Sequence, residues 1–357
     1  MNSIMNYEQE LKDLLATVTL EGGSDLHLSE GRYPTIRVNG LLIPLVRKAI
    51  LTHEDIDSLL NLMIDDASRK RFADTKELDF SYQFNPESRF RGNAYIQRGC
   101  HSIALRLIQN KIKSFKELGL PDVLESFTRM KQGFFLVVGP VGQGKSTTLA
   151  SMVELINQER AEHIITIEDP IEYLYTQKKS IIDQREIHVD TDTFEAALTS
   201  VLRQDVNVIL LGEMRSPETI SAAVTAAETG HLVLSTLHTN NAAQTVDRII
   251  DSFPPNQQDQ IRNQLASSLT GIFSQRLIPR ISGGMVPSYE LMISNNATAN
   301  LIREKRSYEI NTVIETGMGD GMIDMNRSLA ELVRRGEITI ESAYQHSLNP
   351  KNLERMI

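Results

Sequence analysis

The residues best suited to chemistry lie in one glycine-rich segment, GPVGQGKST, at residues 139–147. It fits the pattern G-x-x-x-x-G-K-[ST], directly after an apolar run and directly before an amphipathic one. Glycines let the backbone turn tightly, so that successive N–H groups and the positive end of the following helix can surround phosphate oxygens. We therefore expect a nucleotide to bind through Gly139, Val141, Gly142, Gln143, Gly144, Lys145, Ser146 and Thr147.

Two of these residues have side chains with a specific expected role. Lys145 brings a positive charge toward the β- and γ-phosphates, and the Ser146 hydroxyl is placed to coordinate Mg²⁺. ATP and Mg²⁺ are accordingly the expected cofactors. The alternative is a glycine-rich turn that carries a lysine by chance, and the strand and helix signals on either side argue against it.

Hydrolysis also needs a group that positions or deprotonates water and a group that holds the metal. Glu168 follows the apolar run at residues 164–167, and Glu213 follows the run at 206–211. In open parallel sheets, ligands bind at the carboxyl ends of strands. We assign Glu168 as the water-activating base and Glu213 as the Walker B acid near Mg²⁺; the alternative is that both acids only cap loops. Gly212 stands where a typical Walker B strand ends in aspartate.

Histidines and arginines are further candidate catalytic groups. His231 and His238 flank the apolar run at residues 232–236, and their position beside hydroxyl side chains suggests a γ-phosphate sensor, with a structural role as the alternative. Arg91 and Arg106 belong to an arginine cluster outside the nucleotide-binding segment. P-loop domains often need an arginine from a neighbour to neutralise developing charge, so we expect donation across a subunit contact; solvated surface charge is the alternative.

A sheet must position these groups. From Gly133 onward, short apolar runs alternate with segments of helical periodicity, which is the form expected of a largely parallel sheet covered on both faces. The expected strands are residues 134–138, 164–167, 206–211 and 232–236. After Pro255 the chain is expected to be mainly helical, with one helix carrying Ile261, Leu265, Leu269, Ile272 and Phe273.

The first third of the chain predicts a separate mixed α and β unit. Apolar residues alternate with polar ones at 78–84 and 103–107, as in strands of a sheet with one wet face, and Thr52 can cap a helix. The chain then becomes polar and contains Gly119 and Pro121. We predict an α/β fold class with an amino-terminal α+β domain over residues 1–116, a linker over 117–122 and a nucleotide-binding domain over 123–357.

Composition excludes several classes of protein. Hydrophobic residues make up 41% and charged residues 23%, as in an ordinary globular chain, and the net charge of −9 disfavours wholesale coating of nucleic acid. The longest apolar run, residues 134–138, is far shorter than the ~20 residues of a membrane-spanning helix. The start of the chain is acidic where a signal peptide would be basic, so a cytoplasmic location is expected. The single cysteine, Cys100, excludes a four-cysteine zinc site.

Several motifs together resemble one family, the secretion-type motor ATPases, and within it the type IV pilus retraction ATPases. The resemblance covers nearly the whole chain. Its motifs are SDLHLSEG, RFRGNAY, the Walker A sequence GPVGQGKSTTL, the aspartate box ITIEDPIEY, QREIHVDTDTF, the atypical Walker B sequence ILLGEMRSPETI and the histidine box AAETGHLVLSTLHTNNAAQTVDRIID.

The resemblance implies a homohexameric ring with ATP bound between neighbouring subunits. Each subunit would have an amino-terminal PAS-like domain and a RecA-like ATPase domain with a helical carboxy-terminal region. The implied function is ATP hydrolysis coupled to pilus retraction and twitching motility. The implied partners are an inner-membrane pilus platform protein, at the cytoplasmic face of that membrane, and a second retraction ATPase. No nucleic acid partner is expected.

One late element departs from the family pattern, and several functions compete with retraction. Retraction ATPases usually carry AIRNLIRE, whereas residues 297–304 read ATANLIRE, with Thr298 and Ala299 in place of the Ile-Arg pair. A pilus assembly or type II secretion ATPase is the first competing function, although such relatives generally have longer amino-terminal regions and often a four-cysteine metal element. A RecA-like nucleic-acid motor, which DNA would stimulate in a salt-sensitive way, is the second, and a non-hydrolysing nucleotide-dependent scaffold is the third.

Overall fold

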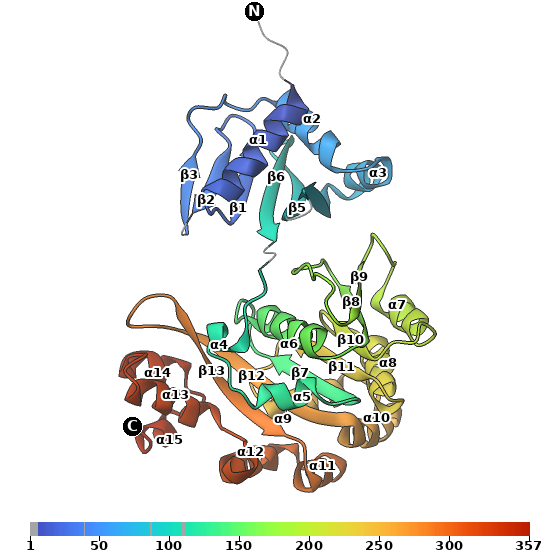
Figure 1. Ribbon diagram of the computed structural model, residues 1–357, viewed down its shortest axis with the longest axis vertical. Helices are drawn as coiled ribbons and strands as arrows, with labels where there is room; N and C mark the ends of the chain where they lie inside the picture. Colours follow the sequence, from blue (N-terminus) through green and yellow to red (C-terminus); the bar gives the residue numbers. More distant parts are fainter. Residues whose placement is uncertain (1–5, 39, 86–87, 109–110) are drawn as a thin grey trace, which may run out of the picture. The chain divides into compact units, whose positions relative to one another are not determined.

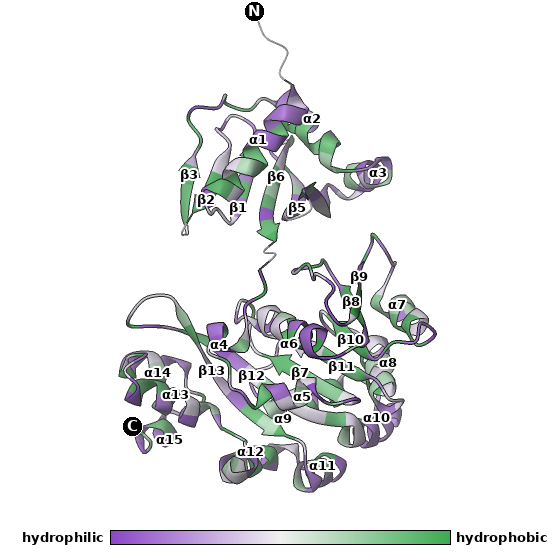
Figure 2. Cartoon of the chain, in the orientation of Figure 1, coloured by the Kyte–Doolittle hydropathy of each residue, from purple (hydrophilic) through white to green (hydrophobic). Residues whose placement is uncertain are grey.

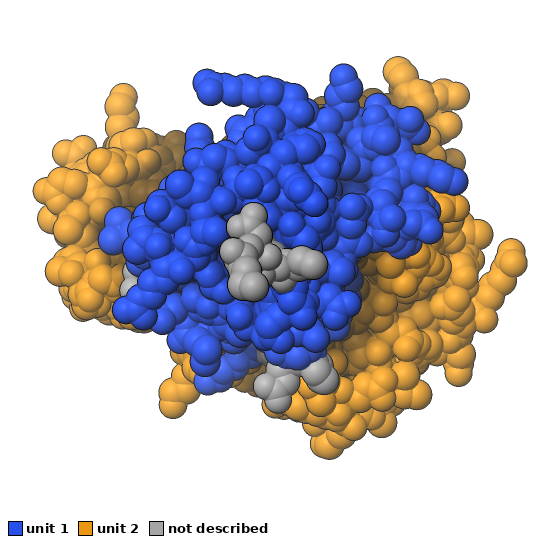
Figure 3. Space-filling model, turned by 90° about the horizontal axis from the view of Figure 1, so that it is seen from above, with its two compact units in different colours: residues 1–111, 172–174 blue, residues 112–171, 175–357 orange. Residues whose placement is uncertain are grey.

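A computed structural model describes residues 6–38, 40–85, 88–108 and 111–357. The chain divides into two compact units, shown in different colours in Figure 3. Unit 1 comprises residues 1–111 and 172–174, and unit 2 comprises residues 112–171 and 175–357. Unit 1 contains an antiparallel sheet and unit 2 a mostly parallel one, so the predicted α/β fold class is confirmed.

The division between the units falls earlier than the sequence predicts. Unit 2 begins at Ile112, and residues 117–122 belong to it instead of forming a linker. The helix α4 (Phe115–Leu118) lies at this point, and Phe115 and Leu120 are buried in a core cluster of unit 2. The apolar residues that anchor this stretch are separated by Lys, Glu, Gly and Pro, which made it look like a polar connection.

Unit 1 combines one sheet with helices that share its apolar core (Figure 1). The strand order is β3-β2-β1-β6-β5-β4, with every neighbouring pair antiparallel. Thr52 caps the second helix in a reciprocal pair with Asp55, as predicted. The elements are α1 (Tyr7–Leu20), β1 (Asp25–Ser29), β2 (Thr35–Val38), β3 (Leu41–Pro44), α2 (His53–Met63), α3 (Asp66–Thr75), β4 (Glu77–Asn85), β5 (Ser88–Gln97) and β6 (Cys100–Ile108).

Unit 2 is built on a sheet in the order β13-β12-β7-β11-β10-β8-β9. Neighbouring strands are parallel except β12 and β13. All four expected strands are present, together with three that the sequence did not reveal, β9, β12 and β13. The strands are β7 (Gly133–Val138), β8 (His163–Glu168), β9 (Ile181–Glu186), β10 (Val208–Leu211), β11 (Leu232–Leu237), β12 (Leu269–Pro279) and β13 (Met285–Ile293).

Helices cover both faces of this sheet, and Figure 2 shows the central strand β7 in the hydrophobic colour. Phe134, Leu136 and Val138 of β7 join one core cluster, while Phe135 and Val137 join another on the opposite face. The remaining elements are α5 (Leu124–Thr128), α6 (Lys145–Glu159), α7 (Phe194–Val201), α8 (Pro217–Glu228), α9 (Ala242–Asp251), α10 (Pro255–Ser268), α11 (Asn296–Arg303), η1 (Ser307–Glu309), α12 (Ile310–Thr316), η2 (Gly317–Asp320), α13 (Met325–Arg334), α14 (Ile340–His346) and α15 (Pro350–Glu354).

The helix expected through Phe273 is wrong in its second half. The helix α10 ends at Ser268, and Leu269, Ile272 and Phe273 lie on β12. This strand pairs with β7 on one side and β13 on the other, and consecutive residues along it are buried, so both of its faces are covered and polar and apolar residues do not alternate. Apolar residues three and four apart then resemble a helix stripe. No helix in the described ranges is both long enough and apolar enough to span a bilayer.

Candidate active site

The glycine-rich segment joins the end of β7 to the start of α6. Gly139, Gly142 and Gly144 have φ angles of 146°, 77° and 77°, which side chains rarely allow. At Gly139 the space is also closed, because a Cβ atom there would lie 2.4 Å from the carbonyl oxygen of Gln275 on β12. The glycines thus permit the sharp turn that leads into the positive end of α6, the arrangement that binds phosphate.

Lys145 is the first residue of α6, and only 7% of it is exposed. Its Nζ donates to the carbonyl oxygens of Gly139 and Pro140 at 2.9 Å and lies 3.2 Å from Nδ1 of His238. Burial, and then the positive charge of Lys145, lower the pKa of His238 below its ordinary value. The shift favours the neutral imidazole, whose Nδ1 can accept a hydrogen bond from the lysine.

Glu213 follows β10, the strand next to β11. Its Oε2 lies 3.9 Å from Nε2 of His238, and its Oε1 lies 2.5 Å from Nη2 of Arg215. His238 therefore stands between Lys145 and Glu213, with one ring nitrogen facing each. The structure brings these three predicted residues together. Sequence reasoning missed Arg215, whose only signal is its position two residues after the acid.

Two side chains with oxygen atoms that could bind Mg²⁺ lie near the carboxyl ends of the strands. Ser146 is in the first turn of α6, and Glu213 follows β10. Mg²⁺ requires hard oxygen ligands and takes one or two of them from the protein, with waters and substrate phosphates completing its octahedron. A hydroxyl and a carboxylate therefore suit the ion that the sequence predicts.

Glu168 is the last residue of β8 and is 7% exposed. Its Oε1 accepts a hydrogen bond from Thr166 at 2.7 Å. Since β8 is three strands from β7, a spacing of ~4.8 Å places the two strand ends ~14 Å apart. A triphosphate held by the P-loop would have to extend across the ends of β11 and β10 before Glu168 could reach the attacking water. Glu213 lies closer to the loop.

The side chain of Gln275 and the amide of Leu277, which we call the β12 clamp, hold the P-loop from the neighbouring strand. Gln275 is 3% exposed, accepts from the Thr148 hydroxyl at 2.6 Å and donates to the Gln143 carbonyl at 2.7 Å. The Leu277 amide donates to the Gln143 side chain at 2.7 Å. Sequence reasoning missed the clamp because it placed this stretch in a helical region.

His231 is not beside the P-loop. It precedes β11, its Nδ1 lies 2.9 Å from the Ala226 carbonyl oxygen, and its own carbonyl accepts from Gly133 at the start of β7. Because β7 and β11 are parallel, His231 lies at the amino-terminal ends of these strands, whereas the P-loop lies at their carboxyl ends. The two ends are roughly 20 Å apart along a six-residue strand. The expected pair of sensing histidines therefore reduces to His238 within one chain.

Arg91 and Arg106 lie in unit 1, where they pair in register on β5 and β6. The Arg106 Nε donates to Asp25 at 2.8 Å although its side chain is 71% exposed. Burial opposes ionisation of Asp25, but hydrogen bonds from Ser24 and Arg106 outweigh it and keep the pKa of this carboxyl below its usual value. Donation of either arginine to a neighbouring subunit remains a prediction.

The late element that departs from the family pattern forms the start of α11. Thr298 is fully buried and takes part in a capping box with Asn295: each residue's backbone amide donates to the other's side chain, at 2.9 and 3.0 Å. Ala299 is 9% exposed. The substitution of Thr for Ile thus has a local structural use, because its hydroxyl accepts a hydrogen bond from the Asn295 amide at the start of the helix.

Comparison with known proteins places this chain in a described family. Residues 3–343 match the model of the Type II/IV secretion system protein family. The chain is 42% identical to the type IV pilus retraction ATPase PilT of Pseudomonas aeruginosa, over 96% of this chain and 99% of that protein. It is 43% identical to a twitching motility protein of Neisseria gonorrhoeae, over 90% of this chain and 86% of the relative.

A solved structure is similar over the same extent. The crystal structure of the pilus retraction motor PilT with bound ADP superposes with a TM-score of 0.90 at 43% identity, covering 96% of this chain and 98% of that one. The fold and the resemblance expected from the motifs are therefore confirmed.

Proposed function

This chain belongs to the Type II/IV secretion system protein family and is a P-loop ATPase, and we propose that it is a motor coupling ATP hydrolysis to type IV pilus retraction. The observation that supports this function is the similarity to a retraction ATPase along nearly the whole of both chains. A match confined to the nucleotide-binding unit would fit many motors, because one fold serves many outputs. Here the likeness extends through unit 1 as well.

The site residues divide into binding and chemistry. The P-loop amides and Lys145 bind the phosphates, while Ser146 and Glu213 hold Mg²⁺. The ion, when bound, neutralises charge on the β- and γ-phosphate oxygens. Glu168 positions the attacking water and takes its proton. Lys145 must exchange the carbonyl oxygens it now contacts for phosphate oxygens, and His238, which contacts its Nζ, registers that exchange.

The assembly belongs to the same proposal. Six copies form a ring in which Arg91 or Arg106 of one subunit completes the site of the next. The ring works at the cytoplasmic face of the inner membrane on a pilus platform protein, alongside a second retraction ATPase. The exposed Arg106 guanidinium, 71% accessible beside a buried carboxylate, supports a role at a contact.

Purified variants test the chemistry. We expect Lys145→Ala to lose nucleotide binding, and Glu168→Gln to bind ATP but release no phosphate. Glu162→Gln is the matched control, because Glu162 lies just before the other end of β8 and pairs with Arg160. Normal phosphate release by Glu168→Gln would remove it as the base and leave Glu213.

Mixing variants tests the shared site. Lys145→Ala subunits mixed with Arg106→Ala subunits are expected to regain some activity, because a few interfaces combine an intact P-loop with an intact arginine. Lys145→Ala mixed with Glu168→Gln is the control, since both residues serve the same chain's site and no mixed interface is complete. Full activity of a monomer at high dilution would contradict the ring.

Deletion of the gene tests the direction of work. Cells without the protein are expected to keep abundant surface pili and to lose twitching motility, and the Glu168→Gln gene is expected not to restore it. Restoring Ile and Arg at positions 298 and 299 is expected to change retraction more than the ATPase rate. Bald cells would refute retraction and indicate an assembly motor.

A further inference from the structure

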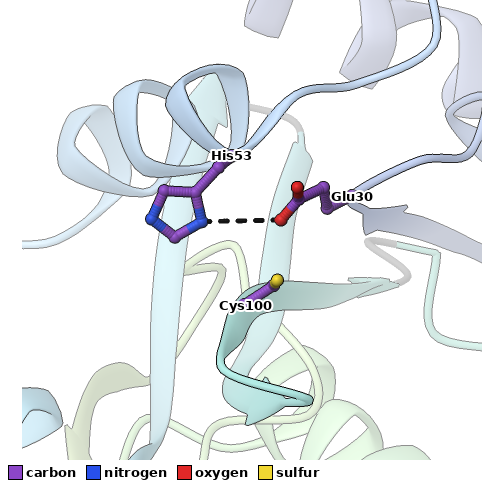
Figure 4. Close-up of side chains that lie close together, drawn as sticks. All are labelled: Glu30, His53 and Cys100. Carbon is purple, nitrogen blue, oxygen red and sulfur yellow. Dashed lines mark ion pairs between the residues drawn. The ribbon is translucent and has the colours of Figure 1, made fainter.

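A second cluster of reactive side chains lies in unit 1 and has no part in the proposed ATP chemistry. Glu30 follows β1, His53 is the first residue of α2, and Cys100 is the first residue of β6. Figure 4 shows the three side chains gathered from these separate segments. One ligand atom from each, a carboxylate oxygen, an imidazole nitrogen and the thiol sulfur, lies within 4.8 Å of the other two. The Nδ1 of His53 is 3.6 Å from Oε2 of Glu30.

A further carboxylate orients the histidine. The Nε2 of His53 lies 3.5 Å from Oδ2 of Asp57, one turn later on α2, while Oδ1 of Asp57 lies 2.5 Å from Nδ1 of His101. Nδ1 of His53 is thereby the nitrogen that faces Glu30. Metal-binding histidines characteristically hold their second nitrogen against a carboxylate in this way.

We propose that Glu30, His53 and Cys100 form a zinc site, with water as the fourth ligand. Thiolate, imidazole and carboxylate together suit Zn²⁺, whereas Mg²⁺ and Ca²⁺ take oxygen ligands. Zinc bonds of ~2.0–2.3 Å in a tetrahedron put ligand atoms ~3.3–3.7 Å apart. The cluster must contract by about 1.5 Å at most, and the side chains of Glu30 and His53 are 38% and 51% exposed and so have room to move.

The thiol proton is the group that zinc displaces. Zinc binds the thiolate form of cysteine, so its binding releases the thiol proton of Cys100 to solvent. It also joins three segments distant in sequence, so it stabilises unit 1.

Cobalt is a suitable probe, because a Co²⁺–thiolate bond absorbs in the near ultraviolet and Cys100 is the only cysteine in the chain. The full chain is titrated with Co²⁺ in a phosphine reductant, with excess Mg²⁺ to occupy the nucleotide site. We expect a sulfur-to-cobalt band that saturates at one metal per subunit, is bleached by Zn²⁺, and is lost in Cys100→Ser. Zinc is also expected to raise the thermal unfolding midpoint of the wild type.

Substitutions test which side chains take part in zinc binding. Glu30→Gln and Asp57→Asn are expected to weaken zinc binding at least tenfold, as lost ligands or orienting partners do. His188→Asn, in a loop outside the cluster, is the control and is expected to change nothing. Circular dichroism of each metal-free variant confirms that it is folded.

Three results would overturn the site. They are no sulfur band at saturating Co²⁺, unchanged zinc affinity in Cys100→Ser, and a band saturating at one metal per two chains, which would indicate an intermolecular cysteine pair. None of these results bears on ATP hydrolysis, so the site and the motor function stand or fall separately.

Discussion

Truncation of Gln275 should loosen the P-loop, although Gln275 itself is not a residue that we expect to bind nucleotide. The Gln275 side chain spans from the Thr148 hydroxyl to the Gln143 carbonyl, at 2.6 and 2.7 Å. Gln275→Ala removes both hydrogen bonds at a position that is 3% exposed. The substitution should leave β12 in its register, because the backbone pairing of this strand with β7 and β13 does not involve the Gln275 side chain.

The size of the effect follows from the two lost bonds. A buried hydrogen bond contributes about 1 kcal/mol net, and a partner left unsatisfied costs about 1–3 kcal/mol. We expect the free energy of unfolding to fall by about 2–4 kcal/mol. Because the loop is no longer held, nucleotide binding must also restore its shape, and about 1.4 kcal/mol of reordering weakens ADP affinity about tenfold.

Urea unfolding and titration with a fluorescent ADP analogue measure the two effects on the same protein. Gln264→Ala is the matched control, because its side chain makes one hydrogen bond, to Glu228, on the surface of α10. We expect that control to change stability by less than about 0.5 kcal/mol. If Gln275→Ala lost stability while its ADP affinity stayed within twofold, the clamp would be structural only, and our account of P-loop positioning would be refuted.

Three other perturbations have defined outcomes. Two hydroxyl groups at the start of α8 lower the pKa of Glu195 from 4.5 to about 2, so its stabilisation is complete above pH 4.5 and is lost as the pH falls toward 2. The free energies of unfolding of wild type and Glu195→Gln, measured in urea, should differ by about 1 kcal/mol at pH 7 and converge at low pH. Burial raises the pKa of Glu290 to about 7, so the free energy of unfolding should fall as the pH rises from 4.5 to 7, and Glu290→Gln should flatten that slope; equal slopes would exclude this group. Gly139→Ala should abolish ADP binding because its Cβ meets the carbonyl of Gln275, whereas Gly142→Ala, with open space around it, should weaken binding far less; equal losses in the titration would show that backbone strain alone decides.

Local patterns in the sequence were sufficient for the P-loop and the strands that carry the site. The loop motif is continuous, and its glycine, lysine and hydroxyl positions are set by the geometry of one turn and one helix end. The strands β7, β8, β10 and β11 are short apolar runs bounded by polar residues, so their ends could be located and the acids Glu168 and Glu213 placed there. Because the strands were expected to be parallel, their carboxyl ends, and with them the P-loop and both acids, were predicted to lie on the same side of the sheet.

Contacts between distant segments could not be read in the same way. The residues of β12 show no strand alternation because both faces of that strand are buried, and only its pairing with β7 and β13 makes it a strand. The β12 clamp exists because this strand lies beside the P-loop, more than a hundred residues away in the chain. His231 and His238 look equivalent in sequence, yet they lie at opposite ends of β11, and only the carboxyl end of that strand is beside the P-loop.

The sequence by itself therefore determined the nucleotide, the reaction and the family, because these depend on contiguous motifs whose chemistry is local. The tertiary structure decided which residues share a site. It placed Lys145, His238 and Glu213 next to one another and kept His231 apart from them. It also brought Glu30, His53 and Cys100 together from three segments. The physical reason is that hydrogen bonding between strands and burial of both sheet faces act across the chain, whereas periodicity reports only on residues a few positions apart.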